Sequence, residues 1–271
     1  MKKSLPLLAA ALALTLTSAN AQPGPHPGMG GPAGPRGTQF TASMAKLFGQ
    51  NSAFSAMLEN HVQTPQGEMV VPGKISFDNG KSRFEMDMSA MKSPMMNDQA
   101  AAHMKMMGMD KMTMISRPDL KAAYMIYPGI QAYSQMTIQD PEAGKSPTDF
   151  KIETTELGKE TVAGHPCIKN KAVVTDSQGT QHESTVWNAT DLKNFPVKIE
   201  TTEHGQQVTM LFKDVSLSKP ADSEFDPPSD YKKYNSMQEM MQAEMMKRMG
   251  GMGGPGGMGA PGGGMTPPPK Q

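Results

Sequence analysis

The first apolar positions of the central chain recur with the spacing of a helix. Four of them lie at i, i+4, i+7 and i+8: Phe40, Met44, Leu47 and Phe48. This spacing predicts a short helix with one apolar face, and Gly49 is a suitable residue to end it. From Ala53 onward the period changes to two, which predicts extended strands.

The next segments alternate apolar and polar side chains on either side of a tight turn. The apolar face of the first expected strand carries Phe54, Ala56, Leu58 and Val62. The pair Asn79-Gly80 predicts a hairpin, because both turn positions favour positive φ. After the turn, apolar residues alternate with charged ones: Phe84, Met86 and Met88 against Arg83, Glu85 and Asp87. One dry and one charged face is typical of an antiparallel sheet that is covered on one side.

Further segments with strand character follow at similar spacing, and Gly, Asp or Asn separates most of them. They cover residues 112–115, 122–127, 130–136, 150–155, 168–175, 183–188, 197–202 and 207–215. About ten or eleven strands in one unit predict a mainly β fold with a few helices, built as a large curved sheet, a barrel or a half-barrel.

Two other segments combine helical spacing with methionine. Between Ser93-Pro94 and Gly108, one stripe contains Met96, Ala100, His103 and Met107. A final helix, expected over residues 235–249, carries Met237, Met240, Met241 and Met245. Such an amphipathic face can pack over the mouth of the sheet, or it can bind a membrane surface or an envelope protein partner.

The beginning of the chain has the pattern of an export signal. Lys2 and Lys3 precede an apolar run, and small residues lead up to Ala21, so we predict a signal peptide that is cleaved after Ala21. The run is too short to span a bilayer, which needs roughly 20 apolar residues. The sequence therefore predicts a soluble periplasmic protein without a transmembrane segment.

Glycine and proline mark the two ends of the exported chain. Both end segments are rich in these residues, so they have little to bury and are expected to be disordered. The expected division is a signal peptide over 1–21, a disordered linker over 22–37, a folded domain over 38–234, the Met-rich helix over 235–249 and a disordered tail over 250–271.

Composition narrows the possible functions. The chain has 26 basic and 26 acidic residues, so its charge gives no reason to expect nucleic acid or an anionic membrane as a partner. One Cys excludes an internal disulfide and a zinc site built from several thiolates. The 28 Met residues are an unusual excess, and eleven of them lie between Met86 and Met114.

Several short motifs occur in the order found in a family of exported bacterial proteins that is a domain family of unknown function. They are Gly158-Lys-Glu-Thr-Val-Ala-Gly164-His165-Pro-Cys167, Val186-Trp187-Asn-Ala-Thr-Asp-Leu192, Phe195-Pro196-Val197-Lys198 and Phe225-Asp-Pro-Pro-Ser-Asp-Tyr231. From about Phe40 to Tyr234 the chain resembles this family, which is similar in fold to the lipoprotein carriers LolA and LolB. The resemblance implies an unclosed antiparallel half-barrel with helices in its concave side. In the carriers, that side holds acyl chains.

The inward face of such a sheet is the first candidate site, because a half-barrel must cover its interior with helices or with a ligand. The residues expected to point inward are Phe84, Met86, Met88, Met112, Met114, Tyr124, Ile126, Tyr133 and Trp187. Met is flexible and polarizable, which suits a pocket for varied apolar shapes. These residues either bind a lipid or an acylated protein, or they are simply core that the Met-rich helices close.

The densest methionine segment is a second candidate, for a soft metal ion. Thioether sulfur prefers Cu(I), and chemically similar Ag(I), and imidazole can join it. The candidate ligands are His103, Met104, Met106, Met107 and Met109. Met is elevated along the whole chain, so the same residues are also explained as a substitute for Leu. Exposed Met can, in addition, act as a sink for oxidants.

Enzyme signatures are otherwise missing from the sequence. His165 and Cys167 lie two apart on an expected strand, but no further group completes a catalytic set, so a buried free thiol is the favoured interpretation. His182-Glu183 begins like a zinc-protease motif, but Val186 stands where the second His is required. We therefore expect a non-enzymatic binding protein without a cofactor. The alternatives are an envelope protein that binds Cu(I) or Ag(I), and an interaction module that docks through its C-terminal helix.

Overall fold

The computed structural model describes residues 40–252, except 95, 139–141, 143–144 and 204. The expected signal peptide over 1–21 and the expected linker over 22–37 lie outside the described residues, as does the chain from residue 253 onward. Among the described helices, none combines the length and hydrophobicity that a membrane crossing requires.

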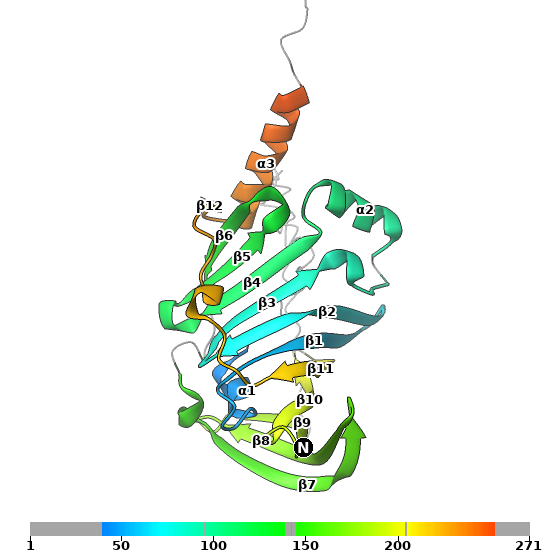
Figure 1. Cartoon of the computed structure of the whole chain (residues 1–271), viewed down its shortest axis with the longest axis vertical. Helices are drawn as coiled ribbons and strands as arrows, with labels where there is room; N and C mark the ends of the chain where they lie inside the picture. Colours follow the sequence, from blue (N-terminus) through cyan, green and yellow to red (C-terminus); the bar gives the residue numbers. More distant parts are fainter. Residues whose placement is uncertain (1–39, 95, 139–141, 143–144, 204, 253–271) are drawn as a thin grey trace, which may run out of the picture. The chain divides into compact units, whose positions relative to one another are not determined.

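One large, open and curved sheet of twelve strands dominates the described chain (Figure 1). The strands are β1 Ala53–Thr64, β2 Gly67–Asp78, β3 Lys81–Asp87, β4 Lys111–Arg117, β5 Ala122–Tyr127, β6 Ala132–Thr137, β7 Lys151–Val162, β8 His165–Thr175, β9 Gln181–Ala189, β10 Phe195–Glu203, β11 Gln206–Ser216 and β12 Lys232–Tyr234. Their order across the sheet is β12-β6-β5-β4-β3-β2-β1-β11-β10-β9-β8-β7. The predicted mainly β fold is confirmed, with slightly more strands than expected.

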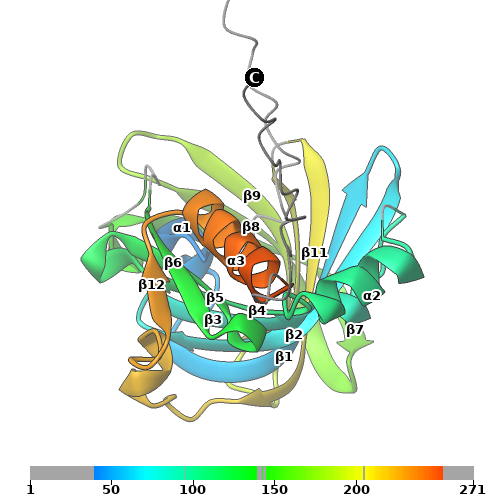
Figure 2. The same ribbon diagram turned by 90° about the horizontal axis from the view of Figure 1, so that it is seen from above.

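Short helices connect and cover these strands. The α-helices of the described residues are α1 Ala42–Lys46, α2 Asp98–Met106 and α3 Met237–Met252, and the 3-10 turns are η1 Met88–Ala90, η2 Pro118–Leu120, η3 Pro128–Ile130, η4 Pro147–Asp149 and η5 Asp222–Phe225. Figure 2 shows α1 and α3 on the inner side of the curved sheet. We call this side the concave face and the opposite side the convex face.

The hairpin between β2 and β3 forms where the sequence predicts it. Asn79 has φ 50° and Gly80 has φ 91°, so both turn residues adopt the left-handed region that the Asn-Gly pair tolerates. The turn fixes the register, in which Phe77 faces Ser82 and Ile75 faces Phe84. A shift by one residue would move every apolar side chain to the other face, so this turn also sets which residues reach the interior.

The N-terminal segment around α1 fills the concave face over the central strands. Its four predicted apolar residues are all buried, although the helix itself is shorter than their spacing suggests. The ring of Phe48 stacks on Phe54 with centroids 4.8 Å apart and meets Phe212 edge-on at 5.7 Å. Strands β1 and β11 supply these two partners, so α1 ties the middle of the sheet to one aromatic cluster.

Residues 217–231, which we call the strap, connect β11 to β12 across the convex face. Phe225 of the strap is fully buried against Ile115 and Ile126 of β4 and β5. Arg117 Nη1 donates to Asp226 Oδ1 at 2.5 Å and anchors the strap at the end of β4. Figure 2 shows the strap passing outside the curved sheet before it reaches β12. It therefore brings the chain around the edge of β6, from which α3 enters the concave side.

We expect Phe48→Ala to lower the free energy of unfolding by about 3–5 kcal/mol, because it removes a fully buried ring from the aromatic cluster and leaves a cavity. Leu120→Ala is the control, since Leu120 is 55% exposed and its loss should cost less than about 0.5 kcal/mol. Urea unfolding followed by circular dichroism measures both. Equal effects of the two substitutions would show that α1 does not anchor the sheet.

Candidate functional site

Methionines line the concave face of β3, β4 and β5. In the register of these strands Met86 lies opposite Met112, and Met114 lies opposite both Phe84 and Met125. Met86 and Met112 are buried, and Met114 and Met125 are partly buried against the same core. We call Met86, Met112, Met114 and Met125 the methionine patch. The strand conformation does not require Met at these four positions, since Leu or Ile would fill the same face of the strand equally well.

The patch lies in a core that contains many more methionines. Other Met side chains buried in this core are Met44, Met88, Met109, Met210 and Met240, and those partly buried against it are Met69, Met91, Met104, Met107 and Met237. Burial raises the pKa of Tyr127 to about 12, so its hydroxyl stays protonated. That hydroxyl donates to Met125 Sδ at 3.3 Å.

Helix α3 covers the interior beside β6 and β12 through its first two turns. Met240 is the one described α3 side chain with no exposed surface, while Met237 and Ala243 are partly buried against the core. The helix begins with a capping arrangement, in which Glu239 N–H donates to Ser236 Oγ at 3.1 Å and Asn235 N–H to Glu239 Oε2 at 3.0 Å. Beyond this start the helix extends past the strands (Figure 1).

The predicted methionine stripe of α3 is divided between two environments. Met237 and Met240 face the core, whereas Met241 and Met245 are exposed. Met245 and its neighbour Met246 are 64% and 74% exposed. The helix therefore packs through the side that carries Met237 and Met240, and it leaves a second group of methionines exposed on the surface.

The prediction that nine residues share the inward face is wrong for three of them. Phe84, Met86, Met88, Met112 and Met114 belong to the main core. Tyr124, Ile126 and Tyr133 instead pack on the convex face around Phe225 of the strap. The strand Ala122–Tyr127 is apolar on both faces, so its sequence could not show which face is covered by which segment.

Trp187 is buried and belongs to the main core. It lies on β9 beside Val186, which is opposite Ile199, and a register shift in β10 faces it. Lys169 and Lys198 lie directly opposite it on β8 and β10. Their Nζ atoms are 4.8 and 4.2 Å from the centroid of its ring. These cation–π contacts explain how the indole is buried under two lysine side chains.

The charge balance around Trp187 is completed by Glu160 of β7. The indole N–H donates to Glu160 Oε1, and this hydrogen bond is the main reason that the pKa of Glu160 lies below its usual value. Lys169 Nζ is also 3.6 Å from the same oxygen. A satisfied indole within a compensated charge cluster has the properties of a structural residue.

Two buried polar atoms on the concave face have no hydrogen-bond partner within the described residues: Asn60 Oδ1 and Ser134 Oγ. Asn60 lies opposite Met210 on β11, and Ser134 lies opposite Met125 on β5. Ser134 also pairs with Tyr234 of β12, just before α3. An unsatisfied buried polar atom costs about 1–3 kcal/mol, so each marks a point where a ligand group could gain a hydrogen bond.

Helix α2 does not gather the predicted metal ligands into one environment. It starts after Asn97, whose Oδ1 accepts from Ala100 N–H at 2.8 Å, rather than at Ser93-Pro94. Met109 is buried and Met104 and Met107 pack against the core, but His103 is exposed and Met106 is 71% exposed. Within the described chain, no group of three or more His, Cys, Asp or Glu could hold a metal ion. Metal binding by these five residues stays a prediction.

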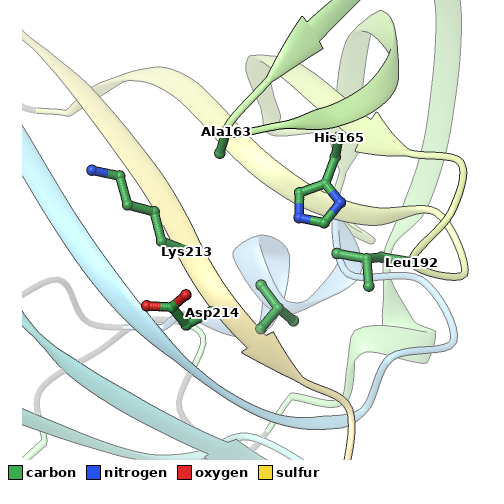
Figure 3. Close-up of a pocket in the computed structure, with 6 residues that line it drawn as sticks. Ala163, His165, Leu192, Lys213 and Asp214 are labelled. Carbon is green, nitrogen blue, oxygen red and sulfur yellow. The ribbon is translucent and has the colours of Figure 1, made fainter.

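A pocket that the sequence did not reveal lies at one end of β11 (Figure 3). Its volume is about 480 Å³, and it is lined by Ala163, His165, Leu192, Lys213, Asp214 and Val215. A register shift between β1 and β11 accompanies it, and Asp214 has φ 50°. Of the lining residues, the sequence indicates only His165 as a candidate for a reactive pair. The others are brought together by two turns and by this irregularity in the strand register, which the sequence pattern does not predict.

Ion pairs occupy the polar groups around this pocket. His165 Nδ1 is 2.9 Å from Asp191 Oδ2, and this hydrogen bond is the main reason that the pKa of Asp191 is lowered. Lys213 Nζ donates to Glu59 Oε1 at 2.8 Å. Two of the polar lining residues, His165 and Lys213, are therefore paired with protein groups, which reduces their capacity to select a ligand.

Cys167 lies near this pocket but forms no catalytic pair with His165. Its Sγ donates to the backbone carbonyl oxygen of His165 at 3.3 Å, whereas the imidazole is bound to Asp191. Burial raises the pKa of the thiol, so the reactive thiolate is scarce.

Comparisons with known proteins agree with the motifs found in the sequence. A family model described as Domain of unknown function (DUF4412) matches residues 54–195. Among solved structures, the chain is similar to a LolA superfamily protein from Nitrosomonas europaea (9% identity, 69% of this chain and 97% of that chain covered, TM-score 0.35). It is also similar to the lipoprotein LppX of Mycobacterium tuberculosis (9% identity, 67% and 98% covered, TM-score 0.38). No curated protein matches the sequence significantly.

We expect Cys167 to react with a thiol reagent at pH 8 at least about tenfold more slowly in the native protein than in urea, because burial raises its pKa and blocks access. Release of the chromophore from a disulfide reagent measures the two rates. The variant Cys167→Ser provides the baseline. Equal rates in both conditions would place the thiol in an accessible site and reopen a reactive role.

Proposed function

We propose that the chain, which belongs to the family described as Domain of unknown function (DUF4412), holds a hydrophobic ligand on the concave face of its sheet. The ligand class is a lipid or an acylated protein, and the role is binding without chemistry. The predicted signal peptide supports a periplasmic location for this role.

The observation that carries the proposal is the limited packing of α3, which buries one described side chain completely and two partly against the core of the concave face. Helix α3 contacts β6 and β12 beside the methionine patch, and Met240 is its one completely buried described side chain. Full burial of a Met side chain is worth about 1.5–3 kcal/mol. A difference of a few kcal/mol leaves a minor state populated at roughly 0.1–10%. Met237, Ala243 and the hydrogen bond from Tyr234 to Glu244 add to this docking energy, so an apolar ligand that displaces α3 must bury a comparable apolar area.

The chemistry of the face supports an acyl chain rather than a polar ligand. Flexible, unbranched Met side chains can repack around apolar shapes of different width. Phe84 and Met88 extend the apolar surface next to the patch. Ser134 Oγ, which is buried without a partner near the start of α3, offers a hydrogen bond to a polar group at the end of such a chain.

Exposed methionines on α3 favour a second candidate, an interaction with an envelope protein partner. Met241, Met245 and Met246 form this surface, and flexible Met side chains are common in surfaces that bind several partners. In this alternative α3 stays docked and its outer side binds. The two functions differ in whether α3 must move.

We expect the wild-type protein to bind a fluorescent fatty acid with one site per chain, and Met240→Glu to bind it about three- to tenfold more tightly. The substitution weakens the docking of α3, which competes with the ligand, and apparent affinity rises with the fraction of open molecules. Fluorescence titration gives both affinities.

Met246→Glu is the matched control, because it adds the same charge to the same helix at an exposed position. Its affinity for the fatty acid should equal that of wild type. The proposal fails if wild type and Met240→Glu, both folded by circular dichroism, bind no probe at micromolar concentration. If instead Met246→Glu abolishes capture of a periplasmic partner and leaves probe binding unchanged, the interaction role gains support alongside it.

A further inference from the structure

We propose that the methionine patch is a binding site for Cu(I), a monovalent soft metal ion, formed by thioethers of Met86, Met112 and Met114, with Met125 beside them. This site differs from the ligands that sequence spacing suggested on α2. It shares the concave face with the hydrophobic ligand, but it depends on sulfur rather than on apolar area.

The register of three neighbouring strands brings these side chains together. Met86 and Met112 are directly opposite on β3 and β4, and Met114 and Met125 are directly opposite on β4 and β5. Opposite residues have Cβ atoms about 4.5–5.5 Å apart. Met112 and Met114 are two apart on one strand, so their Cα atoms are about 7 Å apart on the same face. Three flexible bonds per side chain allow the sulfur atoms to converge above β4.

The donor set selects a soft ion of low charge. Thioethers favour Cu(I), whereas zinc and harder ions require thiolate, imidazole or carboxylate ligands. Within the described residues, His, Cys, Asp and Glu form no cluster of three that could hold a metal. The patch is neutral and largely buried, so it offers no negative charge to balance a divalent ion. The free-energy cost of transferring an ion from water into the protein rises steeply with the charge on the ion, so a monovalent ion is favoured.

The surroundings hold the sulfur atoms in place and provide a cover. Tyr127 donates to Met125 Sδ at 3.3 Å, which fixes one thioether and leaves its second lone pair available. Met240 of α3 belongs to the same core and is fully buried. Burial of Met86 and Met112 keeps the patch largely free of water, and the limited packing of α3 beside β6 and β12 offers a route of entry.

The test is a titration of the full chain with Cu(I), kept reduced by ascorbate, in competition with a coloured Cu(I) chelator. We expect wild type to bind one Cu(I) per chain. The double variant Met112→Leu/Met114→Leu should bind it at least about a hundredfold more weakly, on the basis of about tenfold for each lost thioether. Leu matches the shape of Met closely, and packed cores tolerate this exchange, so the fold should persist and circular dichroism checks it.

Two control variants remove sulfur elsewhere on the chain. Met245→Leu/Met246→Leu changes exposed residues of α3, and Met104→Leu/Met106→Leu changes the earlier candidates on α2. Both should retain wild-type affinity for Cu(I). The proposal is overturned if wild type does not retain Cu(I) against the chelator, or if either control weakens binding as much as the patch variant.

The same variants separate this site from fatty-acid binding. Leu keeps the face apolar, so Met112→Leu/Met114→Leu should bind the fluorescent fatty acid within about threefold of wild type. Loss of Cu(I) with retained fatty-acid binding supports the metal site. Fatty-acid binding without any Cu(I) binding by wild type would overturn the metal site and leave the proposed function standing, whereas Cu(I) binding without fatty-acid binding would do the reverse.

Discussion

An open sheet with one apolar face cannot cover that face by itself, and this constraint explains most of the structure outside the strands. The central strands are covered by α1 and by Phe48, which follows this helix and joins rings from β1 and β11. That contact is local and rigid, because it is built from large side chains that interlock. The strands toward β6 are covered differently, by methionines and by one corner of α3. The two halves of the concave face thus differ in how firmly they are closed.

The position of α3 depends on the strap, which is itself fixed by a separate and smaller core. Phe225 packs on the convex face against Ile115 and Ile126, and Arg117 holds Asp226. Arg83 Nη1 also donates to Glu224 O at 3.1 Å. These contacts do not involve the concave face. A change in the docking of α3 can therefore leave the sheet and the strap intact, which is what a removable cover requires.

The sequence predicted the fold well where one face of a strand is apolar and the other charged. The alternation around Asn79-Gly80 gave both the turn and the orientation of Phe84 and Met86. It failed for Tyr124 and Ile126, because a strand that is apolar on both faces acquires its second cover from a strap about 100 residues later. Strand β12 had no signal, since Lys232–Tyr234 is too short for a period, and the pocket near Asp214 depends on an irregular register.

The choice of Met rather than Leu on β3 to β5 has consequences that apolar area alone does not explain. Both residues keep the face dry, but Met adapts its shape and carries a sulfur lone pair. The first property suits the proposed exchange of α3 for a ligand, since neither partner would need a fixed complementary shape. The second suits a soft ion held between neighbouring strands. Branched residues would specify one packing arrangement more firmly, so a face of methionines is compatible with the exchange of α3 for a ligand that we propose.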